Sequence, residues 1–332
     1  MSAVAPPLSP SLGLHGVQRL LAGLFPEADG AASETPLELT TADARPARLI
    51  SATVIEGGEL RGIPVPGGPE ANFVAFLDGT QTSRVAQYQR GGVPIVLGMV
   101  AAVVRERRDR RMFTWRHVAQ ERLYAPKAQI ARSAWERLVS TGLEVCDTAE
   151  DEDGPNSAEH PLAMREAAVH RVQKDRERAE HALAIEWCGR EERGLFVDGS
   201  ISGADPVARA PVAVGVVKTH RTLYASGDAL TRVLALGQAE RSSVFLVTSP
   251  KRAPVASWYL RIRDPRGHDP MWALLRVEVS AGGMEGREAT RRADEVSRWI
   301  LAEVAPVSLP DGRWDKMVYG VRDCEEFLRA IV

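Results

Sequence analysis

Cysteine is scarce in this chain, which has 3 cysteines among 332 residues. Cys146, Cys188 and Cys324 lie far apart and show neither CxxC spacing nor the Cys/His spacing of a zinc site. We therefore expect neither a disulfide framework nor a structural zinc ion.

Long apolar runs are also missing. No run approaches the roughly 18 apolar residues that a membrane span requires. The first residues, MSAVAPPLSPSLG, lack the basic-then-apolar layout of a signal peptide. The sequence thus predicts a cytoplasmic protein that has no membrane association.

Phosphate-binding loops are absent, since neither GxxxxGK[ST] nor GxGxxG occurs. Nucleotide hydrolysis is therefore not expected of this chain. The net charge of −2 and the pI near 6.4 argue against a protein that coats nucleic acid through bulk charge. Two local basic segments remain, and each either contacts phosphates or forms a solvated face: RERRDRR at 105–111, and a looser cluster of Lys251, Arg252, Arg261, Arg263 and Arg266.

The composition, 44% hydrophobic and 26% charged, is typical of a globular protein. Residues 1–45 are rich in Pro, Ala, Ser and Thr, and their apolar residues follow the spacing of one helix face. We expect them to form an N-terminal extension with one amphipathic helix. This helix would dock on the body of the protein, on a second copy or on another protein. Residues 46–332 would form the main domain.

The first half of that domain shows strand patterns. NFVAFLD at 72–78 predicts a buried strand that ends at Asp78 and Gly79. RVAQYQR and VPIVLGMVAAVV flank Gly91-Gly92 and predict a hairpin. We expect these three strands to form an antiparallel meander. Residues 115–145 are predicted to be helical, and the acidic stretch 147–160 to be a surface loop.

The second half alternates helices and strands. A long helix over 162–187 precedes GLFVDGS, a short buried strand that ends at Asp198 and Gly199. Further strands are expected at 211–218, 244–249, 258–264 and 273–280, and further helices at 287–303 and 322–331. The whole pattern predicts an α/β fold.

Two apolar strands that both end in Asp-Gly suggest a metal site. If they are neighbours in one sheet, Asp78 and Asp198 emerge side by side, and burying like charges together is costly unless a cation lies between them. Oxygen ligands favour Mg²⁺ or Mn²⁺, which suit phosphoryl transfer, and two ions about 4 Å apart would serve phosphodiester hydrolysis. Glu177 and Glu180 lie three apart on the long helix and are candidates for a third carboxylate. Asp-Gly after a strand is also a common turn.

Four segments resemble NurA nucleases, which process DNA ends. FLDGT at 76–80, RGLFVDGS at 193–200, VAVGVVKTH at 212–220, and SWYLRIRD with LLRVEV within 257–279 occur in the family's order and roughly its spacing. The resemblance covers about residues 70–330 and excludes the N-terminal extension. It implies a ribonuclease H-like mixed sheet flanked by helices.

The resemblance further implies that Asp78, Glu180 and Asp198 bind two Mn²⁺ or Mg²⁺ ions, with Glu177 as the alternative to Glu180. Lys218 would contact the scissile phosphate. A homodimer, a DNA substrate and a HerA-like hexameric ATPase that feeds duplex DNA to the nuclease are also implied, in DNA repair or phage defence.

NurA nucleases usually have a histidine at the start of the last helix. The corresponding segment here, RWDKMVYGVRDCEEFL, contains no histidine and so departs from the family. Asp323 stands where the last helix begins and is the expected late metal ligand, with Asp315 as the weaker candidate. His220, near Lys218, would either assist protonation or play no role. The missing histidine also keeps open a catalytically idle subunit that only binds nucleic acid or a translocase, and the fold alone leaves RNA-directed cleavage as a further alternative.

Overall fold

The computed structural model describes residues 12–26, 28, 47–150, 160–304 and 319–332. Its helices are α1 (Gly13–Leu24), α2 (Arg132–Val139), α3 (Pro161–Arg190), α4 (Asp205–Arg209), α5 (Asp228–Leu234), α6 (Gly286–Val304) and α7 (Tyr319–Ile331). Its strands are β1 (Arg48–Leu49), β2 (Thr53–Val54), β3 (Gly62–Pro64), β4 (Ala75–Gln89), β5 (Val93–Arg108), β6 (Arg111–Ala125), β7 (Glu144–Asp147), β8 (Leu195–Asp198), β9 (Ala213–Val217), β10 (Thr222–Leu223), β11 (Glu240–Ser242), β12 (Phe245–Ser249), β13 (Arg252–Arg261) and β14 (Leu274–Ser280).

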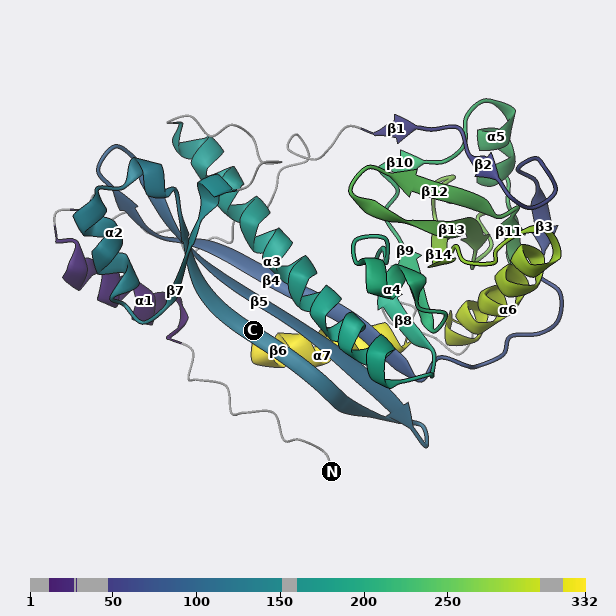
Figure 1. The fold of residues 1–332 in the computed structure, drawn as a ribbon, viewed down its shortest axis with the longest axis horizontal. Coiled ribbons are helices and arrows are strands. Elements are labelled where there is room, and N and C mark those ends of the chain that lie inside the picture. The colour runs from purple at the N-terminus through teal and green to yellow at the C-terminus, as the bar shows by residue number, and fades with distance from the viewer. Residues whose placement is uncertain (1–11, 27, 29–46, 151–159, 305–318) are drawn as a thin grey trace.

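One large mixed sheet organises the described chain (Figure 1), and its main path runs β2-β12-β13-β14-β9-β8-β4-β5-β6-β7. Within it, β4, β5 and β6 are antiparallel neighbours, whereas β8 pairs parallel to both β4 and β9. The central order β6-β5-β4-β8-β9, with a long helix before β8, is that of a ribonuclease H-like core. The predicted fold class, α/β with a mixed sheet flanked by helices, is confirmed.

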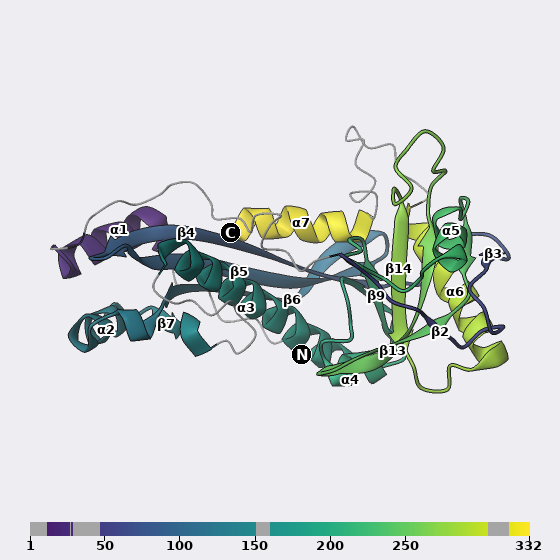
Figure 2. The same ribbon diagram turned by 90° about the horizontal axis from the view of Figure 1, so that it is seen from above.

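Both faces of the central strands are buried, which is why their sequences are apolar runs. Alternate residues serve opposite faces: Phe76 and Phe196 pack in the cluster that includes residues of α6 and α7, while Leu77 and Val197 pack in the cluster that includes α3 and α4 residues. Figure 2 shows α3 and α7 on opposite sides of β4–β6. Each buried Phe or Leu contributes about 1.5–3 kcal/mol of transfer free energy.

The long hairpin strands β4, β5 and β6 extend past this core to a second apolar cluster at the end where α1 and α2 lie (Figure 1). The amphipathic helix expected in the N-terminal extension is α1. Val17, Leu21 and Phe25 are buried against residues of β4, β5 and α2. The helix therefore packs on the body of its own chain. The expected boundary at 45/46 falls outside the described residues.

Two predicted elements are wrong. The strands expected at 72–78 and 84–90 are parts of one strand, because β4 continues through Gly79 without turning. The glycine there provides space rather than a turn, as the site shows below. Residues 115–145 are not one helix: 111–125 form β6, which pairs with β5, and a short 3-10 helix (Lys127–Gln129) and α2 follow it. Pairing with β5 overrides the helical tendency of VAQERL.

The other long elements are found close to their expected bounds. The helix expected at 162–187 is α3, and those expected at 287–303 and 322–331 are α6 and α7. Of the stretch 147–160 that was predicted to be an acidic loop, Asp147 ends β7, Thr148–Glu150 form a short 3-10 helix, and residues 151–159 lie outside the described residues. No described helix has the length and apolarity needed to span a membrane.

Candidate active site

Asp78 and Asp198 lie next to each other on paired parallel strands. Leu77 and Val197 are register partners, and each precedes one of the two aspartates. Pairing of β4 with β8 ends there, because β8 stops at Asp198 while β4 continues. Since paired strands are about 4.8 Å apart, the two carboxylates emerge side by side at the edge of the core.

Glu180 reaches this edge from α3. Gly79 makes the approach possible, because a Cβ on that residue would lie 2.8 Å from Glu180 Cγ, closer than any real side-chain contact. Arg176, one turn earlier on α3, forms an ion pair with Glu180 and donates to Gln81 Oε1 at 3.2 Å. Glycine and arginine together hold Glu180 over β4.

Lys218 follows β9, the next strand of the core, and its Nζ donates to Asp198 Oδ2 at 2.7 Å. The lysine and aspartate side chains are 15% and 18% exposed, so the pair is shielded from water but open on one side. Four residues from three strands and one helix thus meet at one edge: Asp78, Glu180, Asp198 and Lys218.

Crowded carboxylates shift each other's protonation. Burial and the charges of Asp198 and Glu180 raise the pKa of Asp78 to about 7. Burial raises the pKa of Glu180 to about 7, although the Arg176 guanidinium opposes the change. Burial favours the neutral form of Lys218, but the Asp198 charge outweighs it and raises the lysine pKa. At neutral pH, therefore, full ionisation of all three carboxylates is opposed by burial and by their mutual repulsion.

Helix α7 adds two further carboxylates. Asp323 Oδ1 accepts from Arg105 Nε at 2.5 Å, on the β5 side of the helix. Glu325 is close enough to Lys218 for its charge to raise the lysine pKa, and its side chain is 16% exposed. The two residues thus face different parts of the site.

The remaining candidates differ in position. Glu177 lines the cavity beside Asp198 and accepts from Gln173 Nε2 at 3.1 Å. His220 Nε2 is bonded to the Leu274 carbonyl at 2.7 Å, and burial lowers the His220 pKa to about 4. The histidine is therefore neutral and turned toward β14. Asp315 lies outside the described residues.

The fit of a divalent cation depends on the donors present. Among the residues that the structure describes, no three His, Cys, Asp or Glu side chains are arranged as one metal-binding group. Asp198 and Glu180 instead contact the protein cations Lys218 and Arg176. The donors are all carboxylate oxygens, the class that Mg²⁺ and Mn²⁺ prefer. A metal fits this set if these two carboxylates exchange their protein cations for it.

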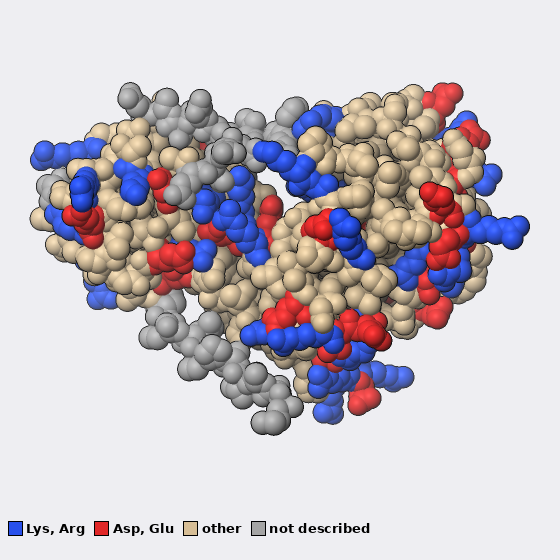
Figure 3. Space-filling model, in the orientation of Figure 1, with Lys and Arg blue, Asp and Glu red and all other residues tan. Residues whose placement is uncertain are grey.

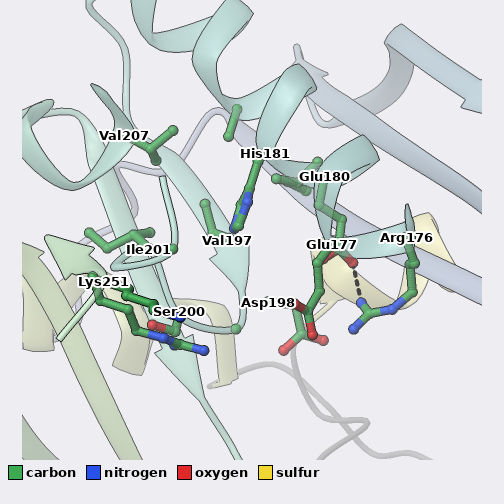
Figure 4. Close-up of a pocket in the computed structure, with 15 residues that line it drawn as sticks. Arg176, Glu177, Glu180, His181, Val197, Asp198, Ser200, Ile201, Val207 and Lys251 are labelled. Carbon is green, nitrogen blue, oxygen red and sulfur yellow. Dashed lines mark hydrogen bonds and ion pairs between the residues drawn. The ribbon is translucent and has the colours of Figure 1, made fainter. Parts of the chain in front are cut away.

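A cavity of about 300 Å³ opens beside the cluster, between α3, the end of β8, α4 and the β12–β13 turn. Figure 4 shows Glu177, Glu180 and Asp198 on one side of it and Lys251 on the other. Its floor is the segment 199–203, which folds back over the sheet. Gly215 permits this close approach, because a Cβ there would lie 2.8 Å from the Gly199 carbonyl oxygen.

The two basic segments of the sequence differ in what their side chains contact. In RERRDRR, Arg105, Arg107 and Arg108 form ion pairs with Asp323, Glu303 and Glu106. In the looser cluster, Arg261 is buried and bonded to backbone carbonyls, whereas Lys251 and Arg252 line the cavity. Figure 3 shows this face hollowed near its middle, with Lys and Arg side chains on both sides of the hollow.

One solved structure matches most of the described chain. Among solved structures, the crystal structure of the NurA nuclease from Sulfolobus solfataricus matches 81% of this chain and 81% of its own, with 10% sequence identity and a TM-score of 0.47. No protein-family model matches the sequence, and neither does any curated protein. Because the identity and the TM-score are both low, the fold rests on the strand order described above and the roles of individual residues rest on the site itself.

Three features of the site were not predicted from the sequence. Glu325 lies in CEEFL, where two adjacent glutamates give no sign of which one faces the sheet. Arg176 sits one turn before Glu180, and this spacing could have indicated an ion pair. The close approach of Gly79 to α3 had no local signal, because it depends on how the helix crosses the strand.

Proposed function

We propose that this protein is a divalent-metal-dependent nuclease that hydrolyses phosphodiester bonds of DNA. One observation carries the proposal: Asp78, Glu180 and Asp198 meet beside Lys218 at one edge of a ribonuclease H-like core. Repelling carboxylates at an open edge are costly to fold unless they bind cations, and a nearby lysine suits an anionic substrate.

Asp78, Asp198 and Glu180 would hold two Mn²⁺ or Mg²⁺ ions. Bound there, such ions activate water and stabilise the leaving oxygen of a phosphodiester. Glu177 is the alternative helical carboxylate. From α7, either Asp323, as the resemblance implies, or Glu325, whose charge acts on Lys218, would complete the set.

Lys218 would donate to a non-bridging oxygen of the scissile phosphate. Its ammonium stays charged at neutral pH because Asp198 lies 2.7 Å away. The same contact fixes the direction of the lysine side chain before substrate arrives. A preorganised cation of this kind stabilises the charge that develops in the transition state.

Cleavage assays test the proposal directly. Linear duplex and single-stranded DNA would be incubated with Mn²⁺, Mg²⁺ or EDTA, and RNA would serve as a parallel substrate. We expect Asp78→Asn and Asp198→Asn to reduce cleavage at least about a thousandfold, as loss of a metal ligand removes most of the catalysis. Asp205→Asn is the matched control, because Asp205 is 57% exposed on α4 and paired with Arg209. Full activity in EDTA, or in either site variant, would refute the mechanism.

A second candidate function is a catalytically idle subunit that binds nucleic acid or a translocase. The ion pairs of Lys218 with Asp198 and of Arg176 with Glu180 favour it, because they neutralise part of the cluster without a metal. Such a protein would bind DNA equally well with Mn²⁺ or EDTA and cleave none. Isothermal titration with Mn²⁺ separates the two, since an idle site would take up no metal.

The resemblance also leads us to propose a homodimer that works with a HerA-like hexameric ATPase, in DNA repair or phage defence. The chain itself carries no phosphate-binding loop motif, so processive movement would have to come from such a partner. Sedimentation of the pure protein, and of its mixture with a hexameric translocase, measures both associations.

A further inference from the structure

The cavity beside the carboxylates has an opposite wall of positive charge. Lys251 and Arg252 occupy this wall at the β12–β13 turn. The turn is anchored to the segment that follows Asp198, because Ala253 N donates to the Ser202 carbonyl at 3.0 Å and Arg252 Nη1 lies 3.5 Å from Ser202 Oγ. Its position relative to the cluster is therefore fixed by the backbone.

Arg252 differs from the other cations around the site. Arg176 and Lys218 each contact a carboxylate, Glu180 and Asp198 respectively. The Arg252 side chain forms no ion pair with any residue that the structure describes, and its one hydrogen bond there is the long one to Ser202 Oγ. Its guanidinium therefore keeps donors available for an anionic ligand in the cavity.

His181 adds an unused polar ring to the same cavity. The imidazole lies directly over segment 199–203, since a Cβ on Gly203 would be 2.6 Å from His181 Cε1. Within the described chain, no hydrogen bond involves either ring nitrogen. Figure 4 shows the ring pointing from α3 toward Ile201 and Ser200.

Lys251 stands at a strained position of the turn. Its φ of 64° lies in the left-handed region, which residues with a side chain rarely adopt. Strained residues of this kind often mark binding sites. Here the strain brings two successive cationic side chains to one cavity.

We propose that this cavity binds a phosphate group of the nucleic acid strand other than the scissile phosphate, with Arg252 as its main ligand and Lys251 and His181 beside it. The proposal rests on the nuclease function only in taking nucleic acid as the ligand. Arginine suits the role because its planar fork donates two parallel hydrogen bonds to phosphate. The carboxylates on the facing wall repel a phosphate, so the phosphate would bind on the Arg252 side of the cavity, away from them.

The test measures DNA binding in EDTA, where cleavage does not interfere. Fluorescence anisotropy of internally labelled 30-nucleotide single strands, over a range of salt, compares the wild type with Arg252→Gln. We expect Arg252→Gln to weaken binding about tenfold and to make the slope of log K against log [salt] shallower by about 0.7, one phosphate contact on a single strand. Arg132→Gln is the charge-matched control, since Arg132 is 94% exposed on α2.

Four strands distinguish the source of the phosphate: one with a 5′-phosphate, one with a 3′-phosphate, one with hydroxyl ends, and a circle. Equal losses on all four show an internal phosphodiester, and a loss confined to one phosphorylated strand shows a terminal phosphate. An unchanged slope on every strand overturns the proposal, even if the wild type cleaves DNA. Conversely, an Arg252-dependent slope in a protein that never cleaves would support the phosphate site and refute the nuclease.

Discussion

Gly79 on β4 and Glu180 on α3 approach so closely that no side chain fits between them. A Cβ on Gly79 would lie 2.8 Å from both Cγ and Cδ of Glu180. The glycine thereby sets the position of a candidate metal ligand, although it carries no donor itself. The backbone of Gly79 and the carboxylate of Glu180 are therefore positioned together.

Gly79→Ala is therefore expected to push Glu180 away from the cluster and to lower the cleavage rate about a hundredfold, because a small misplacement of a reacting group has large effects. The fold should survive, since β4 accepts alanine in its extended conformation. Cleavage rates and thermal melting measure the two effects. Gly189→Ala on α3 is the control, because a Cβ there meets nothing within 4 Å. A full-rate Gly79→Ala protein would mean that Glu180 is not a ligand.

Lys218→Gln should reduce the cleavage rate by about 10²–10³, the usual loss when one preorganised donor to a developing charge is removed. DNA binding should change little, because Lys218 would act on the phosphate that reacts. Single-turnover cleavage and anisotropy separate the two. Lys218→Arg should recover part of the rate. Equal losses in binding and in rate would instead indicate a general phosphate contact.

The central strands could be predicted because they are buried on both faces: FVAFLD and LFVD are apolar runs that end in a carboxylate. That these strands belong to a ribonuclease H-like sheet followed from the resemblance to NurA nucleases, because the apolar pattern alone does not say which strands are neighbours. The same pattern predicts that the first strand ends at Gly79, but β4 continues through this residue. Local sequence cannot distinguish a glycine that turns the chain from one that makes room for a helix.

The helical side of the site was harder to predict for the same reason. Periodicity placed Glu177 and Glu180 on one helix but left open which one reaches the sheet, since that depends on the angle at which α3 crosses β4. The α7 carboxylates posed a similar problem. The sequence predicts Asp323 as the late ligand from its place at the start of the last helix, whereas in the structure Asp323 contacts Arg105. That ion pair joins residues 218 positions apart and left no sequence signal.

The metal-free protein should lose stability as the pH rises through 7. Asp78 and Glu180 have folded-state pKa values of about 7, above the roughly 4 of an unfolded carboxyl group. The folded state therefore binds more protons between pH 4 and 7. The stability this provides is fully present below pH 4 and is lost as the pH rises through 7.

Thermal melting in EDTA at pH 6.5 and 8.5 measures this loss, which should amount to a few degrees. Asp78→Asn removes one of the titrating groups and should melt with a smaller difference between the two pH values. Because His220 is unchanged in both proteins, its opposite contribution at lower pH cancels in the comparison. Saturating Mn²⁺ should remove most of the wild-type loss by binding the folded state. Identical pH profiles for wild type and Asp78→Asn would contradict the coupled cluster.

The two α7 carboxylates allow the final prediction. Asp323 is bonded to Arg105, and loss of that partner leaves a largely buried guanidinium with only Thr114 and the Met112 carbonyl. We expect Asp323→Asn to lower the free energy of unfolding by about 1–3 kcal/mol and thereby the melting temperature. The Mn²⁺-induced rise in melting temperature should stay unchanged. Glu325 contacts Arg329 at the helix surface and acts on Lys218.

Glu325→Gln should therefore do the reverse: it should leave the metal-free protein nearly as stable, shrink the Mn²⁺-induced rise and slow cleavage. Melting curves with and without Mn²⁺, together with cleavage rates, give all three quantities for both variants. Glu326→Gln is the matched control, because Glu326 pairs with Arg322 on the exposed side of α7 with a side chain that is 57% exposed. If Asp323→Asn shrinks the Mn²⁺ effect and Glu325→Gln does not, Asp323 leaves Arg105 when metal binds. It would then be the late ligand that the resemblance to NurA nucleases implies.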